Sequence, residues 1–319
     1  MSDMTPRKMT PSLLERAAEM YDFGEIKRVQ PEVPPVAPAA PVEAKAAPAQ
    51  ESAPAPAPAP VVAPRPVPAP AARGAVAPID RTLLAEQGML VPGAPIGALA
   101  EEFRLVKRQL LTTARAVRVR DGDLSRTILV CSAQPDDGKT YCALNLAISM
   151  AAERDLEVLL IDADFAKPDV MARLGLSEGP GLLDALADPH VDVEACVVRT
   201  DIPHLSVLPC GTKTHADTEL VASAGTGELI ARLLAADPKR LLIFDSPPVL
   251  AASPAAALAN HAGQVMLVVR ADRTGDGDLR AAVDLLDGCD HIQLLLNAVS
   301  YAPGGRRFGS YYGQQEDAT

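Results

Sequence analysis

The stretch Arg126–Thr140, RTILVCSAQPDDGKT, decides the fold. It begins with a short apolar run, Arg126–Ser132, which is followed by a turn-forming loop and predicts a buried strand. The loop ends in Gly-Lys-Thr, and an apolar helical pattern from Lys139 to Ala152 follows at once. Backbone N–H groups at the start of a helix bind phosphate, so this strand, loop and helix predict a phosphate-binding loop.

Eight consecutive residues of this loop are the candidate nucleotide contacts: Gln134, Pro135, Asp136, Asp137, Gly138, Lys139, Thr140 and Tyr141. In the motif G-x-x-x-x-G-K-[ST], the lysine reaches the β- and γ-phosphates and the hydroxyl residue binds Mg²⁺. Lys139 and Thr140 occupy those places, whereas Ala133 replaces the first glycine. The alternative, an ordinary turn, is disfavoured by the position of Gly-Lys-Thr between strand and helix. ATP and Mg²⁺ are the expected cofactors.

Two further apolar runs end in carboxylates. Glu157–Asp162 leads into Asp162-Ala163-Asp164, and Leu241–Asp245 leads into Asp-Ser-Pro-Pro. A parallel sheet binds its ligands at the carboxyl ends of its strands, so Asp162, Asp164 and Asp245 are expected to converge on the phosphates and the metal. Any one of them alone could equally be a helix cap, but the three together favour a nucleotide site.

The remaining patterns extend the same architecture. Continuous apolar strands that alternate with helices indicate a mostly parallel sheet with helices on both faces, an α/β P-loop NTPase fold. The other expected elements are a helix at 96–114, a strand at 205–209 with helical sequence to 236, strands at 264–269 and 292–296, and a helix at 277–286.

A proline-rich region precedes this domain. Residues 31–80 hold 15 of the 30 prolines, mostly in Ala-Pro alternation, which predicts a semi-extended linker without a core. The expected organisation is a short segment at 1–30, a disordered Pro/Ala-rich linker at 31–94, the P-loop domain at 95–300 and a flexible tail at 301–319. Residues 12–21 could form a docking helix, and a disordered tail is the alternative.

Composition narrows the class of protein. A net charge of -11 argues against a nucleic-acid surface. The five cysteines are scattered without a C-x-x-C pair, and the five histidines are dispersed, so neither disulfides nor a metal cluster are expected. No run approaches the roughly 18 apolar residues of a membrane helix, and the N-terminus does not resemble a signal peptide. We expect a cytoplasmic protein that a partner recruits to the inner face of the membrane.

The three motifs in this order resemble those of the bacterial tyrosine kinases of capsule and exopolysaccharide export, and most of all the tyrosine autokinases associated with exosortase-type polysaccharide loci. In that family the second strand reads hydrophobic-D-x-D and the third ends D-x-P-P, as at Asp162-Ala163-Asp164 and Asp245-Ser246-Pro247-Pro248 here. The resemblance covers about residues 95–312. Partition and division-site ATPases resemble this fold too, but their signature lysine falls at Gln134.

The resemblance implies roles for the site residues. Lys139 would neutralise the γ-phosphate, and Thr140, Asp162 and Asp245 would hold the metal. Asp162 would also orient or deprotonate the tyrosine hydroxyl, with support from Asp164. Asn297, just after the last expected strand, would contact adenine.

The resemblance also implies self-association and a membrane partner. Glu101, Arg104 and Lys107 resemble the E-x-x-R-x-x-R oligomer motif of the family and fall on one helix face. A solvated charged face is the alternative. The resemblance implies that the chain forms a homo-oligomer with the shape of a ring. It also implies that a separate membrane chain-length regulator acts as activator.

Three of the five tyrosines, Tyr301, Tyr311 and Tyr312, lie in the last 19 residues among glycines. In the family, a similar cluster is phosphorylated between subunits, so these three are the expected phosphoacceptors. An unstructured tail with incidental tyrosines is the alternative.

Two departures from the family pattern leave a second function open. Asp136 stands where the family has glycine, and Ala166 stands where it often has arginine, whose charge Lys167 could supply. Asp tolerates left-handed backbone better than most residues, so the loop shape can survive. The alternative function is an ATP switch that controls assembly without tyrosine transfer.

Overall fold

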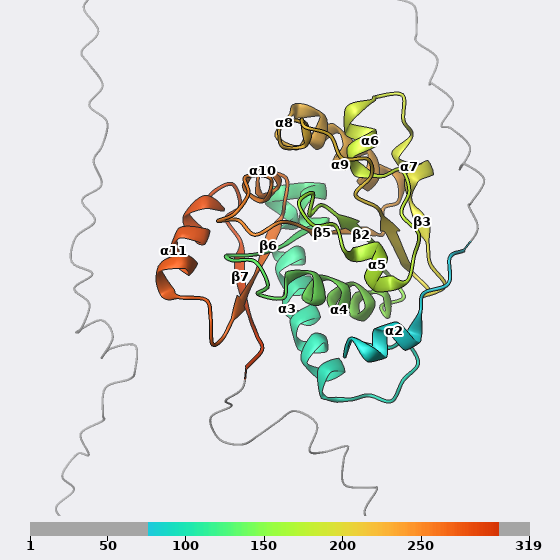
Figure 1. The fold of residues 1–319 in the computed structure, drawn as a ribbon, viewed down its shortest axis with the longest axis vertical. Coiled ribbons are helices and arrows are strands. Elements are labelled where there is room, and N and C mark those ends of the chain that lie inside the picture. The colour runs from blue at the N-terminus through green and yellow to red at the C-terminus, as the bar shows by residue number, and fades with distance from the viewer. Residues whose placement is uncertain (1–75, 300–319) are drawn as a thin grey trace, which may run out of the picture. The chain divides into compact units, whose positions relative to one another are not determined.

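The computed structural model describes residues 76–299, which contain one seven-stranded sheet (Figure 1). The strand order is β3-β4-β2-β5-β1-β6-β7, and every neighbouring pair is parallel except β3 with β4. The strands are β1 (Thr127–Ser132), β2 (Glu157–Asp162), β3 (Val198–Arg199), β4 (Leu205–Leu208), β5 (Arg240–Asp245), β6 (Gln264–Arg270) and β7 (Ile292–Asn297). The predicted α/β class and mostly parallel sheet are confirmed.

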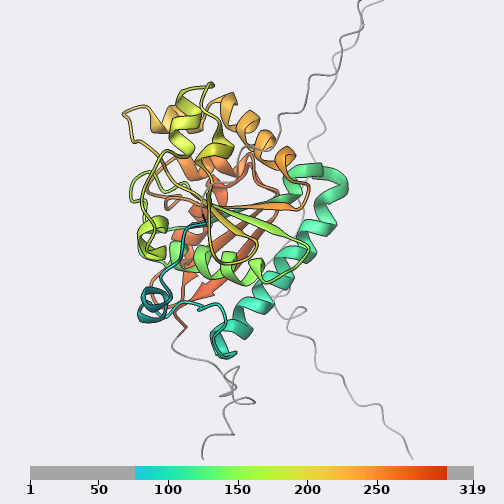
Figure 2. The same ribbon diagram turned by 90° about the vertical axis from the view of Figure 1, so that its right-hand side faces the viewer.

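Helices cover both faces of this sheet (Figures 1 and 2). Side chains alternate along β1, so that Ile128 and Val130 face one core and Leu129 and Cys131 face the other. The first core is covered by α2 (Arg81–Glu86), α3 (Ala98–Asp121), α4 (Lys139–Ala151) and α5 (Val170–Leu174). The second is covered by α6 (Leu182–Ala187), α7 (Val193–Cys196), α8 (Asp217–Val221), α9 (Ala224–Ala236), α10 (Pro254–Ala259) and α11 (Asp276–Leu285).

The strand register brings the acidic motifs to one edge. β5 lies between β1 and β2, with Asp245 opposite Val130 on one side and opposite Asp162 on the other. Because all three strands are parallel, their carboxyl ends and the loop after β1 meet at this edge.

The N-terminal boundary of the domain differs from the prediction. Residues 76–94, expected in the linker, pack onto the domain: Ile79, Leu84 and Met89 are buried in the first core. The side chain of Asp80 caps α2 by accepting a hydrogen bond from the N–H of Leu83. The prediction that the linker reaches residue 94 is therefore wrong for this segment, which we call the strap.

Two other differences have local causes. α3 runs to Asp121, beyond the predicted end at 114, because Leu110 and Val117 continue its buried face and Gly122 ends it with φ 55°. After α3, the short 3₁₀ helix η1 (Gly122–Arg126) leads into β1. β3 was not predicted, since two residues carry no readable alternation.

Within residues 76–299, no helix combines the length and apolar character needed to cross a membrane.

Candidate active site

The loop between β1 and α4 has the backbone of a phosphate-binding loop. Gly138 has φ 98°, and a Cβ there would lie 2.1 Å from the Nδ2 atom of Asn297, so only glycine fits. Asp136 also has a left-handed backbone, with φ 64°, which confirms that aspartate can take this place. The carboxylate of Asp137 is buried and accepts a hydrogen bond from the N–H of Gln134 at 3.1 Å. The loop is therefore braced from within.

Two side chains from neighbouring strands hold the outside of the loop. The guanidinium of Arg270, at the end of β6, donates to the carbonyl of Asp136 at 2.9 Å. The amide of Asn297, at the end of β7, donates to the carbonyl of Asp137 at 2.9 Å. Asn297 thus contacts the loop backbone, and its predicted contact with adenine stays a prediction. The contact of Arg270 with the loop was not predicted, although this residue directly follows the strand expected at 264–269.

Lys139 and Asp164 form an ion pair across the site. The Lys139 Nζ atom lies 2.6 Å from a carboxylate oxygen of Asp164, and only 13% and 3% of the two side chains are exposed. The other oxygen of Asp164 accepts from the N–H of Lys167 at 3.1 Å. The ammonium of Lys139 is therefore paired with a buried carboxylate from the end of the neighbouring acidic motif.

Asp245 is the least satisfied polar group of the site. Its side chain is fully buried, and among the described residues neither carboxylate oxygen has a hydrogen-bond partner. Burial raises the pKa of Asp245 to about 8, against the opposing effect of the Lys139 charge. The hydroxyl of Thr140 is near enough to lower this pKa as well, but it does not reach hydrogen-bond geometry.

The hydroxyl of Thr140 and the carboxylate of Asp245 have the chemistry that binds a magnesium ion. Mg²⁺ prefers carboxylate and hydroxyl oxygens and is bound through one or two protein ligands together with phosphate oxygens. A buried carboxylate without a partner is costly unless something positive binds it. The chemistry of Thr140 and Asp245 therefore fits Mg²⁺, and the metal-binding role of Thr140, Asp162 and Asp245 stays a prediction.

Asp162 is placed differently from its neighbours. One carboxylate oxygen accepts from the N–H of Asp164 at 3.3 Å, and the other accepts from the N–H groups of Asp169 and Val170 at 3.1 Å each. Burial raises its pKa to about 7 despite these bonds. The carboxylate thus anchors the start of α5 and does not line the adjacent pocket, whereas Asp164 does.

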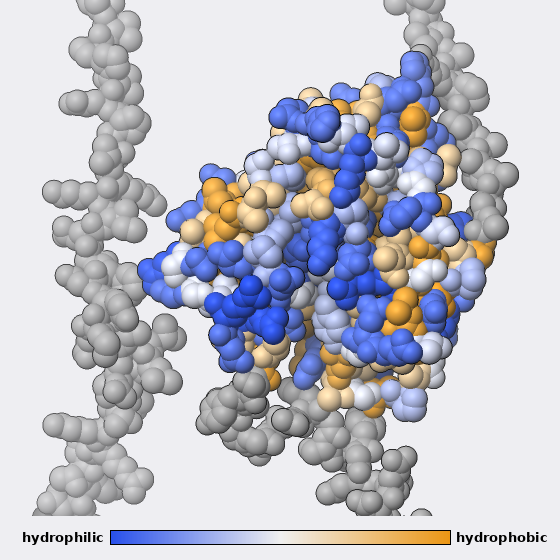
Figure 3. Space-filling view, viewed as in Figure 1, coloured by the Kyte–Doolittle hydropathy of each residue, from blue (hydrophilic) through white to orange (hydrophobic). Residues whose placement is uncertain are grey.

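The pocket beside the loop has a volume of about 260 Å³. Its lining includes Lys139 and Thr140 of the loop, Lys167 and Arg173 from the segment after β2, and the Pro-Pro pair after Asp245. The face of the protein that Figure 3 shows is mainly hydrophilic at its centre. Charged groups of both signs around a small pocket suit a phosphorylated ligand.

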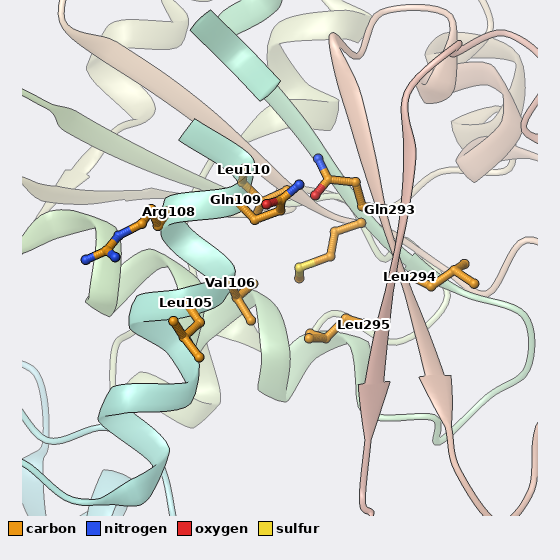
Figure 4. A pocket seen from close by; sticks show the side chains of 9 residues that line it. Leu105, Val106, Arg108, Gln109, Leu110, Gln293, Leu294 and Leu295 are labelled. Atoms are coloured by element: carbon orange, nitrogen blue, oxygen red, sulfur yellow. The ribbon is translucent and has the colours of Figure 1, made fainter. Parts of the chain in front are cut away.

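A larger cavity, of about 410 Å³, lies between α3 and β7 (Figure 4). Its lining includes Leu105, Leu110, Met266 and Leu295, and Arg108 is its one charged residue. An apolar cavity without the phosphate loop does not suit a nucleotide, so the smaller pocket is the candidate active site.

The remaining predicted site residues fall into three groups. The hydroxyl of Tyr141 donates to the carbonyl of Gly88 at 2.8 Å, so its side chain ties α4 to the strap. Glu101 and Arg104 pair with each other on the surface of α3. Lys107 instead binds within the chain, to the carbonyl of Ser149 and the carboxylate of Glu153. Tyr301, Tyr311 and Tyr312 lie outside the described residues.

Comparison with known proteins supports the resemblance, although no protein-family model matches. Tyrosine-protein kinase YwqD of Bacillus subtilis is 34% identical over 164 residues, which are 51% of this chain and 68% of YwqD. Tyrosine-protein kinase wzc of Salmonella typhimurium is 30% identical over 61% of this chain, which spans only 27% of wzc. The kinase domain of the Escherichia coli tyrosine kinase ETK has the same fold: 72% of this chain matches 93% of that domain with a TM-score of 0.55 and 23% identity.

The likeness to YwqD extends over more than two thirds of that kinase. In this chain, the acidic ends of β2 and β5 and the phosphate-binding loop after β1 meet at one edge of the sheet. This chain therefore belongs to the family of bacterial tyrosine-protein kinases.

Proposed function

We propose that this chain is an ATP-dependent protein-tyrosine autokinase that phosphorylates C-terminal tyrosines of neighbouring copies and regulates the polymerisation and export of a polysaccharide. The observation that carries the proposal is the buried carboxylate of Asp245, which has no hydrogen-bond partner within residues 76–299 and lies close to Lys139 of the phosphate-binding loop. Family membership supports this reaction class, and the tail offers candidate acceptors within the same chain.

Phosphoryl transfer depends mainly on positioning and charge stabilisation. The loop amides and Lys139 bind the phosphates, and Arg270 and Asn297 keep the loop in shape. Magnesium, held by Thr140 and Asp245, would neutralise charge on the phosphate oxygens. The acceptor hydroxyl gives its proton to a carboxylate of the Asp162-Ala163-Asp164 motif. Asp164 is the better candidate because it lines the pocket, while Asp162 fixes the start of α5.

The proposal includes assembly and recruitment. By resemblance to the family, the chain forms a homo-oligomer through α3 and is activated by a membrane chain-length regulator that brings it to the inner face of the membrane. Arg104, which is exposed, and Glu101, which is half-buried, form their pair on the outer side of α3 and are the members of the motif available for such a contact. Lys107 serves within the subunit.

Incubation with Mg-ATP followed by mass spectrometry of the C-terminal peptide tests the proposal. Phosphotyrosine on residues 301–319 is the expected result, and the cytoplasmic segment of the regulator is added in a second reaction. Robust ATP turnover without phosphotyrosine in either reaction would reject the kinase in favour of the ATP switch.

A further inference from the structure

The rim of the pocket carries cations that the proposed transfer does not use. Lys167 lines the pocket from the loop after β2 and is exposed. Lys213, in the loop after β4, is also exposed, and its Nζ atom donates to the carbonyl of Ala166, a residue of the same rim, at 3.2 Å. Among the ion pairs formed within residues 76–299, none includes either lysine.

The loop that presents Lys213 is held in place. The carboxylate of Asp184 accepts from the N–H groups of Gly181 and Thr212 at 2.8 and 3.1 Å. Gly211 has φ 89°, and a Cβ there would lie 2.4 Å from that carboxylate. One carboxylate oxygen of Asp217, the next acidic residue along the chain, accepts hydrogen bonds from the N–H and the hydroxyl of Thr214 at 2.8 Å each. Lys213 is therefore presented by a braced loop, and within residues 76–299 it forms no ion pair with the carboxylates of that loop.

The proposed acceptor tail carries the matching charge. Glu316 and Asp317 follow Tyr312 by four and five residues, a separation of at most about 18 Å in extended chain. An acidic peptide is repelled by the phosphates of ATP. Cations at the rim can offset that repulsion and keep the acidic residues away from the metal ligands.

We propose that Lys167 and Lys213 form a substrate-recognition site that binds the acidic residues C-terminal to the acceptor tyrosine, here Glu316 and Asp317 of a second copy. This inference rests on the proposed kinase function and adds substrate selectivity to it. The tail then enters the pocket with its C-terminal end toward the loop after β4. The preferred acceptor is a tyrosine followed, four or five residues later, by carboxylates.

The test measures tyrosine transfer between two full-length chains. The enzyme is an active chain whose Tyr301, Tyr311 and Tyr312 are replaced by Phe, and the substrate is the Lys139→Met chain with an intact tail. Exposed ion pairs change affinity by up to about fivefold each, so Lys167→Gln with Lys213→Gln in the enzyme should raise KM for the substrate chain roughly 5- to 20-fold. Lys213 does not line the nucleotide pocket, so Lys213→Gln alone should raise this KM by up to about fivefold and leave the maximal rate and the affinity for ATP within about twofold.

The matched control is Lys239→Gln with Arg232→Gln, which removes two exposed cations: one from α9 and one before the amino end of β5. It should leave KM unchanged. Glu316→Gln with Asp317→Asn in the substrate chain should reproduce the loss of the lysine variant, and the two changes together should add little more. Effects that multiply independently, or a fall in ATP affinity in the Lys213→Gln variant, would overturn the recognition site.

Failure of the proposed function looks different. If the wild-type enzyme transfers no phosphate, the kinase assignment fails. The role of Lys167 and Lys213 in peptide recognition is then tested by binding of a synthetic peptide of residues 300–319 to the nucleotide-loaded chain. Weaker binding to the lysine variant than to the control variant supports the site. Equal binding to both overturns it.

Discussion

Asp245 shows how one side chain can lower the stability of a domain in exchange for a binding site. Its buried carboxylate has no hydrogen-bond partner among the described residues, and burial raises its pKa from 3.8 to about 8. The folded protein therefore keeps a proton that the unfolded chain releases. The stability contributed by this proton is fully present below pH 3.8, and it is lost as the pH rises toward about 8.

Asp245→Asn should therefore stabilise the nucleotide-free protein at high pH. The amide keeps the shape and removes the ionisation, and we expect a gain on the order of 1–3 kcal/mol at pH 8, with a smaller difference at pH 5. Thermal unfolding at both pH values measures it. Added Mg-ATP should reverse the order, because the amide is a poorer metal ligand. A difference independent of pH would contradict the ionisation of Asp245 as the cause.

Lys139→Met tests the phosphate loop, with one complication that the ion pair introduces. Mg-ATP affinity should fall strongly because Lys139 is the one cation of residues 132–140. The variant should also lose about 3–5 kcal/mol of stability, since Asp164 is left buried without its partner. Adding Asp164→Asn should recover much of the stability without recovering nucleotide binding, as calorimetry and thermal unfolding can show. Unchanged ATP affinity in the single variant would remove the assignment.

At the scale of the element, α3 carries two different kinds of charged residue. Glu101 and Arg104 pair on the surface, whereas Lys107 joins α3 to the end of α4. The sequence showed the shared helix face but could not show which charge turns inward, because that depends on the position of Ser149 and Glu153.

Mutation should distinguish the role of the surface pair, Glu101 and Arg104, from the role of Lys107. Glu101→Ala with Arg104→Ala should give a smaller species in light scattering and leave thermal stability nearly unchanged, because alanine favours helix. Lys107→Ala should lower the unfolding temperature by a few degrees, through loss of its hydrogen bond and ion pair. An unchanged mass in the first variant would identify the pair as a solvated charged face.

At the scale of the whole molecule, the parts readable from sequence are those with strong local patterns. The strands β1, β2, β5 and β6 are continuous apolar runs, and the parallel sheet then fixes where their acidic ends meet. The strap was missed because it follows a proline-rich stretch and because its buried residues Ile79, Leu84 and Met89 stand five residues apart, which matches neither a helical nor a strand period. The loop contacts of Arg270 and Asn297, and the burial of Asp162, depend on distant segments that no local pattern reveals.

The last prediction concerns transfer between copies. Tyr311 and Tyr312 stand fourteen and fifteen residues beyond the end of β7, far enough along the chain to reach a neighbouring site, whereas Tyr301 is only four residues beyond it. We therefore expect phosphate first on Tyr311 and Tyr312. Tyr141 should stay unmodified because its hydroxyl is bonded to Gly88.

Mixing decides whether the transfer is intermolecular. A Lys139→Met chain with an intact tail is combined with an active chain whose three tail tyrosines are Phe, and phosphopeptides are mapped by mass spectrometry. Phosphate on the inactive chain is the expected result. Each phosphate adds about -1.5 to -2 charges to a chain of net charge -11, so the assembly should loosen as the reaction proceeds, which light scattering on the same sample can follow. If wild-type chains alone become phosphorylated but the inactive chain in the mixture does not, each copy modifies its own tail.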